Sequence, residues 1–365
     1  MNQNHSVKIQ ILSPVHIGAG AEKNWQRGAD FVHANGQIYI LNQMLVWESL
    51  DTAQQNRYID LLGTGKLKEV EKLLVDNLDL EDVATNIFNY NGTLQSREIK
   101  TIMRDGNGSA YIPGSSIKGA IASALFHFLY QNKQADFDNE PTVKDLLGTF
   151  DRALGRYIRP YDSSAMETEV NDVDLYNLYK QGTNWQGDYK ENFRIVVETF
   201  KPDTEGEMRL SLATSLADFM TKKQPNGSLL PKYYQEALGE KPLETLFKII
   251  NDYTHTHAQR EHAYFTKYND LEDIDLILEQ LEGIMAETEK PLSTTSCILR
   301  LSFGSGFHGI TGDWRYEDHT ESIGTPDRRN LIYNRDTRQK EPARYKSRRL
   351  VFPYGGIMGF IKLSL

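Results

Sequence analysis

Cysteine is nearly absent from this chain of 365 residues, in which Cys297 is the only one. A single cysteine excludes an internal disulfide and a cysteine-rich zinc site, and it fits a reducing cytoplasm. Long apolar runs are also absent: none approaches the roughly 20 residues that a membrane-spanning helix needs. The polar N-terminus lacks the apolar core of a signal peptide. We therefore expect a cytoplasmic protein without a cofactor or a metal site.

An overall excess of positive charge is missing too, because the net charge is −9. Nucleic-acid-binding proteins usually carry a basic excess. The charge is unevenly distributed, however: residues 300–365 hold 12 Lys/Arg against 7 Asp/Glu, and the first 299 residues hold 29 against 43. Thr325–Leu350, the basic arm, has nine cations against three acids. Such a cluster can bind phosphates, whereas the alternative is a solvated loop whose charge maintains solubility. The acidic remainder suits protein partners.

The segment Tyr111–Gly119, with the sequence YIPGSSIKG, predicts an anion site at the start of a helix. Pro113 ends an extended approach, because a residue before proline avoids helical dihedral angles. Helical spacing follows, with a hydroxyl available as N-cap, in the apolar residues Ile117, Ile121, Ala124, Leu125, Phe128 and Leu129. The amide N–H groups of a first helical turn attract anions, and Lys118 adds a cation there. The alternative is a capped core helix without a ligand.

Two further strands each lead into a glycine-containing loop. Val7–Ile11 alternates apolar and polar residues and continues into Ser13–Gly20, which we call the first glycine loop. Cys297–Phe303 reads as a strand that continues into Gly304–Gly309, the second glycine loop. Each loop contains one histidine, and the repeated construction suggests two related β-rich halves.

The remaining pattern indicates mixed α and β structure. Asn35-Gly36 predicts a hairpin within residues 30–40, and Asn42 is positioned to cap a helix. Further expected elements are helices near residues 54–62 and 66–78, an extended stretch at 97–103, a polar loop or insertion over 160–190, paired strands at 193–200 and 208–212, and helices within 213–289 that include 242–250 and 271–285. This order is compatible with a βαββαβ plan.

Three apparent catalytic or ligand motifs fail on their context. The GxGxxG pattern of the second glycine loop is followed by a polar stretch rather than by an apolar helix. The sequence GTGK at Gly63–Lys66 lacks the first glycine of a P-loop and the hydroxyl residue that binds magnesium. His255, His257 and His262 cannot point to one metal from a single helix, because His257 lies about 160° around the helix from His255. A polar helix surface explains them better.

Four motifs together carry a resemblance to a known family: SPVHIGAG, YIPGSSIKGAI, FGSGFHG and RRLVFPYGGIMGFIKL. They resemble the RAMP superfamily of CRISPR proteins, and within it the fifth subunit of type III-A (Csm) effector complexes, although Ser13 stands where threonine is more usual. The resemblance implies an α+β fold of RAMP type with a ferredoxin-like (RRM-like) core. It also implies binding of CRISPR guide RNA near its 3′ end, capping of a filament of sister RAMP subunits, a requirement in guide maturation for antiviral defence, and no catalytic centre.

On this basis we predict a non-catalytic RNA-binding subunit in contact with guide RNA and sister RAMP subunits, with target RNA and host nucleases as further partners. The predicted domains are a RAMP domain at 1–212, a helical insertion at 213–292 and a β-rich half at 293–365. The predicted RNA-binding residues are His16, Gly18, Gly20, Gly114, Ser115, Ser116, Lys118, Gly304, Ser305, Gly306, His308, Arg344, Arg348 and Arg349. Two alternatives stay open: an endoribonuclease that cuts precursor guide RNA through His16 or His308, and a cap that contacts only protein.

Overall fold

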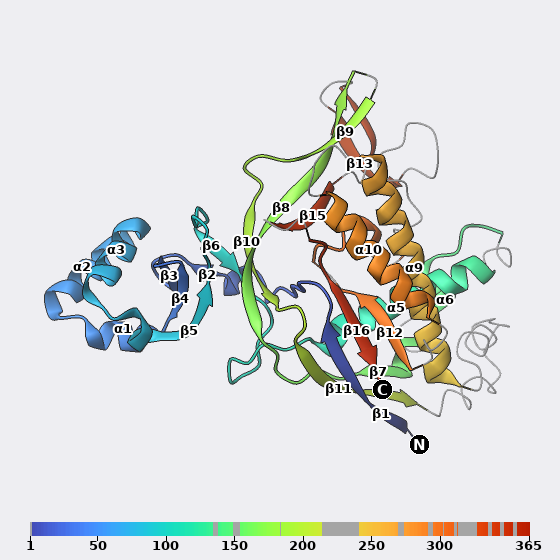
Figure 1. Cartoon of the computed structure of the whole chain (residues 1–365), viewed down its shortest axis with the longest axis horizontal. Helices are drawn as coiled ribbons and strands as arrows, with labels where there is room; N and C mark the ends of the chain where they lie inside the picture. Colours follow the sequence, from blue (N-terminus) through green and yellow to red (C-terminus); the bar gives the residue numbers. More distant parts are fainter. Residues whose placement is uncertain are drawn as a thin grey trace.

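Two large β-sheets form the centre of the protein in its computed structural model. The structure describes residues 2–133, 138–148, 154–182, 184–213, 241–268, 274–290, 295–301, 303–309, 312, 327–334, 338–343, 347–352 and 356–365. Figure 1 shows a small α/β unit on one side of the sheets and a pair of long helices on the other. The predicted α+β class is confirmed.

The first sheet joins strands from both ends of the sequence. Its order is β12 (Ser296–Arg300), β16 (Phe360–Ser364), β1 (Asn2–Ile11), β11 (Glu205–Ala213) and β7 (Ile158–Pro160), and all neighbours are antiparallel. Since β12 and β1 both run antiparallel to β16, they run in the same direction, and their C-terminal ends lie at the same end of the sheet. The two glycine loops therefore leave the sheet at one end, on either side of β16.

Two helices cover this sheet and close the main core. In α5 (Gly114–Lys133), the side chains of Ile117, Ile121 and Leu125 are buried at four-residue spacing, as the apolar pattern predicts. They pack in one apolar cluster with β1, where Val7 and Ile9 are fully buried, and with helix α9 (Pro242–Lys267). Helix α10 (Ile274–Glu289) lies against α9. Both helices fall in the predicted helical block, while its residues 214–240 lie outside the described part of the chain.

The second sheet corrects one expectation, because residues 168–181 and 184–189 form strands within the segment 160–190 that was predicted as a loop or insertion. Its order is β15 (Ser347–Phe352), β8 (Thr168–Gln181), β10 (Ile195–Phe200), β6 (Glu98–Lys100) and β2 (Trp25–Gln26), and β9 (Asn184–Tyr189) pairs with β8 as a hairpin. Polar residues on β8 obscured the strand in the sequence. Asp174 accepts two hydrogen bonds from Arg194, each 2.9 Å long, and Asp172 accepts one of 2.7 Å from Tyr90. These partners allow carboxylates to lie on a partly covered sheet face.

The expected pairing of β10 with β11 is also wrong, because the two strands lie in different sheets. The turn between them leads from the second sheet to the first. In this turn the N–H of Asp203 bonds to the carbonyl of Ile11, at the end of β1, at 2.9 Å. β1 then pairs with β11 over nine residue pairs. A longer partner strand, which alternates apolar and polar residues over Val7–Ile11, was available elsewhere in the sequence, and β11 pairs with it instead of with the nearby β10.

Residues 31–89 form the small α/β unit at the left of Figure 1. Its sheet contains β3 (Phe31–Ala34), β4 (Gln37–Leu41) and β5 (Ala84–Asn89), and its helices are α1 (Gln43–Ser49), α2 (Thr52–Gly63), α3 (Leu67–Asn77) and α4 (Leu80–Val83). The predicted hairpin turn is confirmed, because Asn35 and Gly36 have φ values of 53° and 74°. Asn42 caps α1 as expected, accepting from the N–H groups of Met44 and Leu45.

The other described elements are short. They are helix α6 (Val143–Leu147), the 3-10 turns at Ala21–Lys23, Leu154–Arg156 and Phe307–Gly309, and a two-stranded ribbon of β13 (Asp327–Asn334) and β14 (Gln339–Ala343) in the basic arm. No helix in the described ranges is both long and apolar enough to span a membrane. Strands of the predicted first and third domains share the first sheet; the domain boundaries stay a prediction.

Candidate nucleic-acid interface

The first glycine loop is held by backbone hydrogen bonds on both sides. The N–H of Ala19 bonds to the carbonyl of Thr101 at 3.1 Å, and the N–H of Met103 bonds to the carbonyl of Ile17 at 3.0 Å. Gly18 and Gly20 are exposed, and Gly20 has a φ of 110°. Glycine adopts this dihedral angle without strain, which suits a loop whose backbone faces solvent.

The start of α5 lies next to this loop. The N–H of Tyr111 bonds to the carbonyl of Met103 at 3.3 Å, so one short segment separates the two motifs. At the first residue of the helix, the N–H of Gly114 donates to Oδ1 of Asp162 at 2.8 Å. A carboxylate of the chain therefore occupies part of the position where we predicted an external anion, and it interacts favourably with the helix dipole.

The other residues of this motif differ in exposure. Ser115 is exposed, whereas Ser116 and Lys118 are half-buried. The Lys118 side chain extends beside Gly155, so that a Cβ atom added to this glycine would lie 3.2 Å from Cε of the lysine. Of the predicted phosphate contacts on α5, Ser115 is thus the most open to solvent.

The second glycine loop meets the first across the end of β16. The rings of His16 and Phe303 make an edge-to-face contact with centroids 5.0 Å apart. The N–H of Gly359 bonds to the carbonyl of Pro14 at 2.9 Å, and the N–H of Leu301 bonds to the carbonyl of Gly359 at 2.7 Å. Motifs separated by nearly 300 residues in the sequence are therefore joined in one region of the fold.

The two histidines of the glycine loops point into the protein. His16 is 3% exposed and His308 is 2% exposed. Nδ1 of His16 lies 2.7 Å from the carbonyl oxygen of Glu198, which can only accept, so Nδ1 carries the proton. Burial lowers the pKa of His16, and the nearby Lys100 lowers it further against the opposing hydrogen bond to Glu198. His16 is therefore a neutral imidazole whose contacts are with protein groups.

The predicted arginines of the C-terminal half have protein partners as well. Arg348 is 3% exposed and its Nε donates to Oε2 of Glu261 at 2.7 Å. Arg349 is half-buried and its Nη1 donates to the carbonyl of Phe193 at 2.9 Å. Ser305 is buried, while Gly304 and Gly306 are partly exposed and have φ values of 82° and 73°. Arg344 lies outside the described residues.

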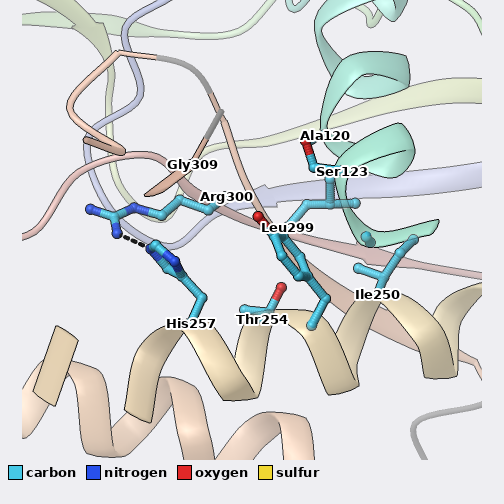
Figure 2. A pocket seen from close by; sticks show the side chains of 10 residues that line it. Ala120, Ser123, Ile250, Thr254, His257, Leu299, Arg300 and Gly309 are labelled. Atoms are coloured by element: carbon cyan, nitrogen blue, oxygen red, sulfur yellow. Dashed lines mark hydrogen bonds between the residues drawn. The ribbon is translucent and has the colours of Figure 1, made fainter. Parts of the chain in front are cut away.

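A small cavity lies behind the second glycine loop, between α5, α9 and β12 (Figure 2). Its volume of about 10 Å³ holds about one water molecule, which is far below the size of a nucleotide. Figure 2 shows His257 and Arg300 at its margin, with Nη1 of Arg300 2.5 Å from Nε2 of His257. This gap is part of the core packing and gives access to no ligand of nucleotide size.

The sequence interpretation missed the burial of His257, which was expected on a polar helix surface. The signal was present in the spacing: His257 and Glu261 continue the buried stripe of α9 that includes Ile250, Thr254 and Phe265. His262 lies at the surface as expected, 3.1 Å from Glu282. Among the residues that the structure describes, no group of His, Cys, Asp or Glu could hold a metal ion.

Comparison with known proteins identifies the class. Residues 8–316 match the family model described as the RAMP superfamily, and the chain belongs to that superfamily. It is similar to the CRISPR system Cms protein Csm5 of Methanocaldococcus jannaschii, with 24% identity over 82% of this chain and 71% of that protein. It is also similar to the protein of the same name from Streptococcus thermophilus, with 28% identity over 40% of this chain and 43% of that protein.

Two solved structures share the fold. A chain of a Csm–crRNA–target RNA ternary complex of a type III-A system superposes over 100% of both chains with a TM-score of 0.67 and 17% identity. The crystal structure of T. onnurineus Csm5 superposes over 98% of this chain and 100% of that one, with a TM-score of 0.60 and 18% identity. These similarities confirm the predicted RAMP-type fold.

Proposed function

We propose that this protein is a non-catalytic RNA-binding subunit of a type III-A CRISPR effector complex. In this role it caps the backbone filament at the 3′ end of the guide RNA and is needed for guide maturation in antiviral defence. The observation that carries the proposal is the meeting of both glycine loops and the start of α5 at one end of the first sheet. The relatives named Csm5, and the related chain in a complex that contains crRNA and target RNA, support the same role.

The predicted residues fall into two groups by exposure: those that face solvent and can contact RNA, and those that support the loops from the interior. Backbone at Gly18, Gly20 and Ser115 is placed to approach the sugar–phosphate chain, because these residues face solvent. The half-exposed residues Ser116, Lys118, Gly304 and Gly306 extend this surface, whereas the half-buried Arg349 bonds to the carbonyl of Phe193. The buried residues support the loops from the protein interior, and they are His16, Gly114, Ser305, His308 and Arg348. A neutral, enclosed His16 fits this supporting role better than acid–base catalysis, which requires contact with the reacting atoms.

Ultraviolet crosslinking in the native host tests the proposal directly. The tagged protein is purified after irradiation, and the ends of the RNA that it retains are sequenced. Guide RNAs crosslinked near their 3′ ends, together with sister RAMP subunits, are the expected result. Uncleaved precursors crosslinked at repeat boundaries would favour an endoribonuclease instead. Absence of RNA enrichment would mean that the glycine loops are structural, and the proposal would fail.

Replacing Lys118 with alanine tests the phosphate contact on α5. If the ammonium group contacts one phosphate, its loss is expected to reduce the slope of log affinity against log salt by about 0.7 for single-stranded RNA. Affinity is measured on the full chain with a single-stranded RNA of the guide 3′-terminal sequence, over a series of salt concentrations. Lys248→Ala, at an exposed position on α9, is the matched control. Equal slopes for the two variants would remove Lys118 from the interface.

A further inference from the structure

A buried group of charged residues lies directly beneath the second glycine loop. Glu261 on α9 is 2% exposed, and its Oε2 faces two guanidinium groups, Arg348 Nε at 2.7 Å and Arg300 Nη1 at 3.8 Å. Arg348 belongs to β15 in the second sheet, and Arg300 is the last residue of β12 in the first sheet. One carboxylate thus links both sheets and α9.

Two cations face this one carboxylate. Burial lowers the pKa of Arg300, but an arginine side chain is not deprotonated in proteins, so both guanidinium groups are cations. Burial and the neighbouring Arg300 lower the pKa of His257 to about 3, so its imidazole is neutral at pH 7. Although burial alone would raise the pKa of Glu261, the charges of Arg348 and Arg300 hold it well below its usual range. Arg348 makes the closer contact with Glu261, and the presence of the second cation needs another explanation.

The contacts of Arg300 supply that explanation. Its side chain is 7% exposed. Nη2 donates to the carbonyl of Gly304 and Nε donates to the carbonyl of Met358, each at 3.2 Å. Nη1 donates to Nε2 of His257 at 2.5 Å. The guanidinium also lies 4.9 Å from the ring centroid of Phe360. Gly304 opens the second glycine loop, and Met358 precedes Gly359, whose N–H bonds to Pro14 of the first loop. Arg300 thus connects both loops.

We infer that Arg300, supported by Glu261 and His257, is a positioning residue that fixes the second glycine loop for RNA binding without contacting RNA itself. The inference rests on the proposed function, because it takes the loop as part of the RNA surface. The geometry favours positioning over direct contact. A phosphate cannot reach a side chain that is almost fully enclosed, whereas a planar fork of donors can hold two carbonyl oxygens in a fixed relation. A loop held in one conformation before binding loses less entropy when RNA binds.

Arg300→Met tests the inference, because it removes the fork and its charge but leaves the Glu261–Arg348 pair in place. Exchange of the amide hydrogens of residues 303–309 is expected to become faster. The affinity of the full chain for a single-stranded RNA of the guide 3′-terminal sequence is expected to fall about tenfold, as a loop must then be ordered on binding. The salt slope is expected to stay unchanged, since no phosphate contact is lost. Lys248→Met, exposed on the same helix as Glu261, is the control and is expected to change neither quantity.

Several results would overturn the inference. Unchanged amide exchange in the loop would show that Arg300 does not hold it. A smaller salt slope would mean that Arg300 contacts phosphate directly. Faster exchange with unchanged affinity would separate the loop from the RNA surface. If Arg300→Met does not fold, Arg300→Lys replaces it, because lysine keeps the positive charge but has a single ammonium group instead of a fork of donors. Amide exchange in the loop of this variant is expected to be faster than in the natural protein and slower than in an unprotected chain. Failure of the unsubstituted protein to bind RNA would refute the proposed function, while the exchange measurement still decides whether Arg300 positions the loop.

Discussion

Replacing Gly114 with alanine is expected to lower the free energy of unfolding by about 3 kcal/mol, the upper end of the cost of overpacking. A Cβ atom at this position would collide with the carbonyl oxygen of Pro160 and would lie 2.8 Å from the carbonyl carbons of Pro160 and Tyr161. These neighbours are backbone atoms at the end of β7, which pairs with β11, so they cannot rotate away as a side chain can. The start of α5 would have to shift, and the hydrogen bond from Gly114 to Asp162 would be weakened.

Gly119 provides the matched control in the same helix. It is exposed, and nothing lies within 4 Å of an added Cβ atom. Alanine there is expected to raise the free energy of unfolding by about 0.5–1 kcal/mol, because glycine is the less favourable residue inside a helix. Urea-unfolding curves of the two variants should therefore shift in opposite directions. A stable Gly114→Ala protein would contradict the close approach of α5 to β7.

Stability is expected to fall as the pH drops from 7 to 5.5, by about 1 kcal/mol for each histidine that is buried in its neutral form. Burial lowers the pKa of His127 to about 4, and burial with the adjacent Arg300 lowers that of His257 to about 3. The pKa of His16 is shifted in the same direction, chiefly by burial. The unfolded chain binds protons near pH 6.5, whereas the folded chain resists them. The stabilisation is therefore complete above pH 6.5 and is lost as the pH falls.

Two carboxyls, the buried Glu198 and the half-buried Asp172, oppose this trend in part. Burial raises the pKa values of Glu198 and Asp172, despite the lowering effects of Arg104 on the first and of Tyr90 and Arg194 on the second. The folded protein binds their protons more readily than the unfolded chain does. His257→Gln isolates the histidine contribution, since the amide oxygen can still accept from Arg300 but does not titrate over this range. The free energy of unfolding of this variant should depend less steeply on pH between 7 and 5.5. Identical slopes would contradict a neutral, enclosed His257.

Features set by neighbouring residues were predictable from the sequence. Asn35-Gly36 dictates a tight hairpin through its backbone conformation, and Asn42 caps α1 with its own side chain. The stripe of Ile117, Ile121 and Leu125 locates α5 and its buried face. The family motifs placed both glycine loops among the predicted RNA-binding residues, but their meeting through His16 and Phe303 was not predicted.

Features set by distant partners were not predictable in the same way. Arg348 stands among other cations in the sequence and was expected at the surface, but its carboxylate partner Glu261 lies 87 residues away. The polar strand β8 likewise depends on Arg194 and Tyr90, whose positions only the folded chain reveals. A charged side chain is buried only where an opposite charge or a hydrogen-bond partner offsets the loss of water, and that partner can come from any part of the chain.

The place of β16 between β12 and β1 has a consequence for biosynthesis. β1 pairs Lys8 with Ser364, so β1 acquires this neighbour only after all the residues between them have been synthesised. Until then β1 and β12 each present an unpaired edge, and such edges promote association with other chains. Pairing across so long a separation also forms slowly. Newly made protein therefore passes through a stage in which the two glycine loops are not yet joined, and protection from association with other chains is most valuable at that stage.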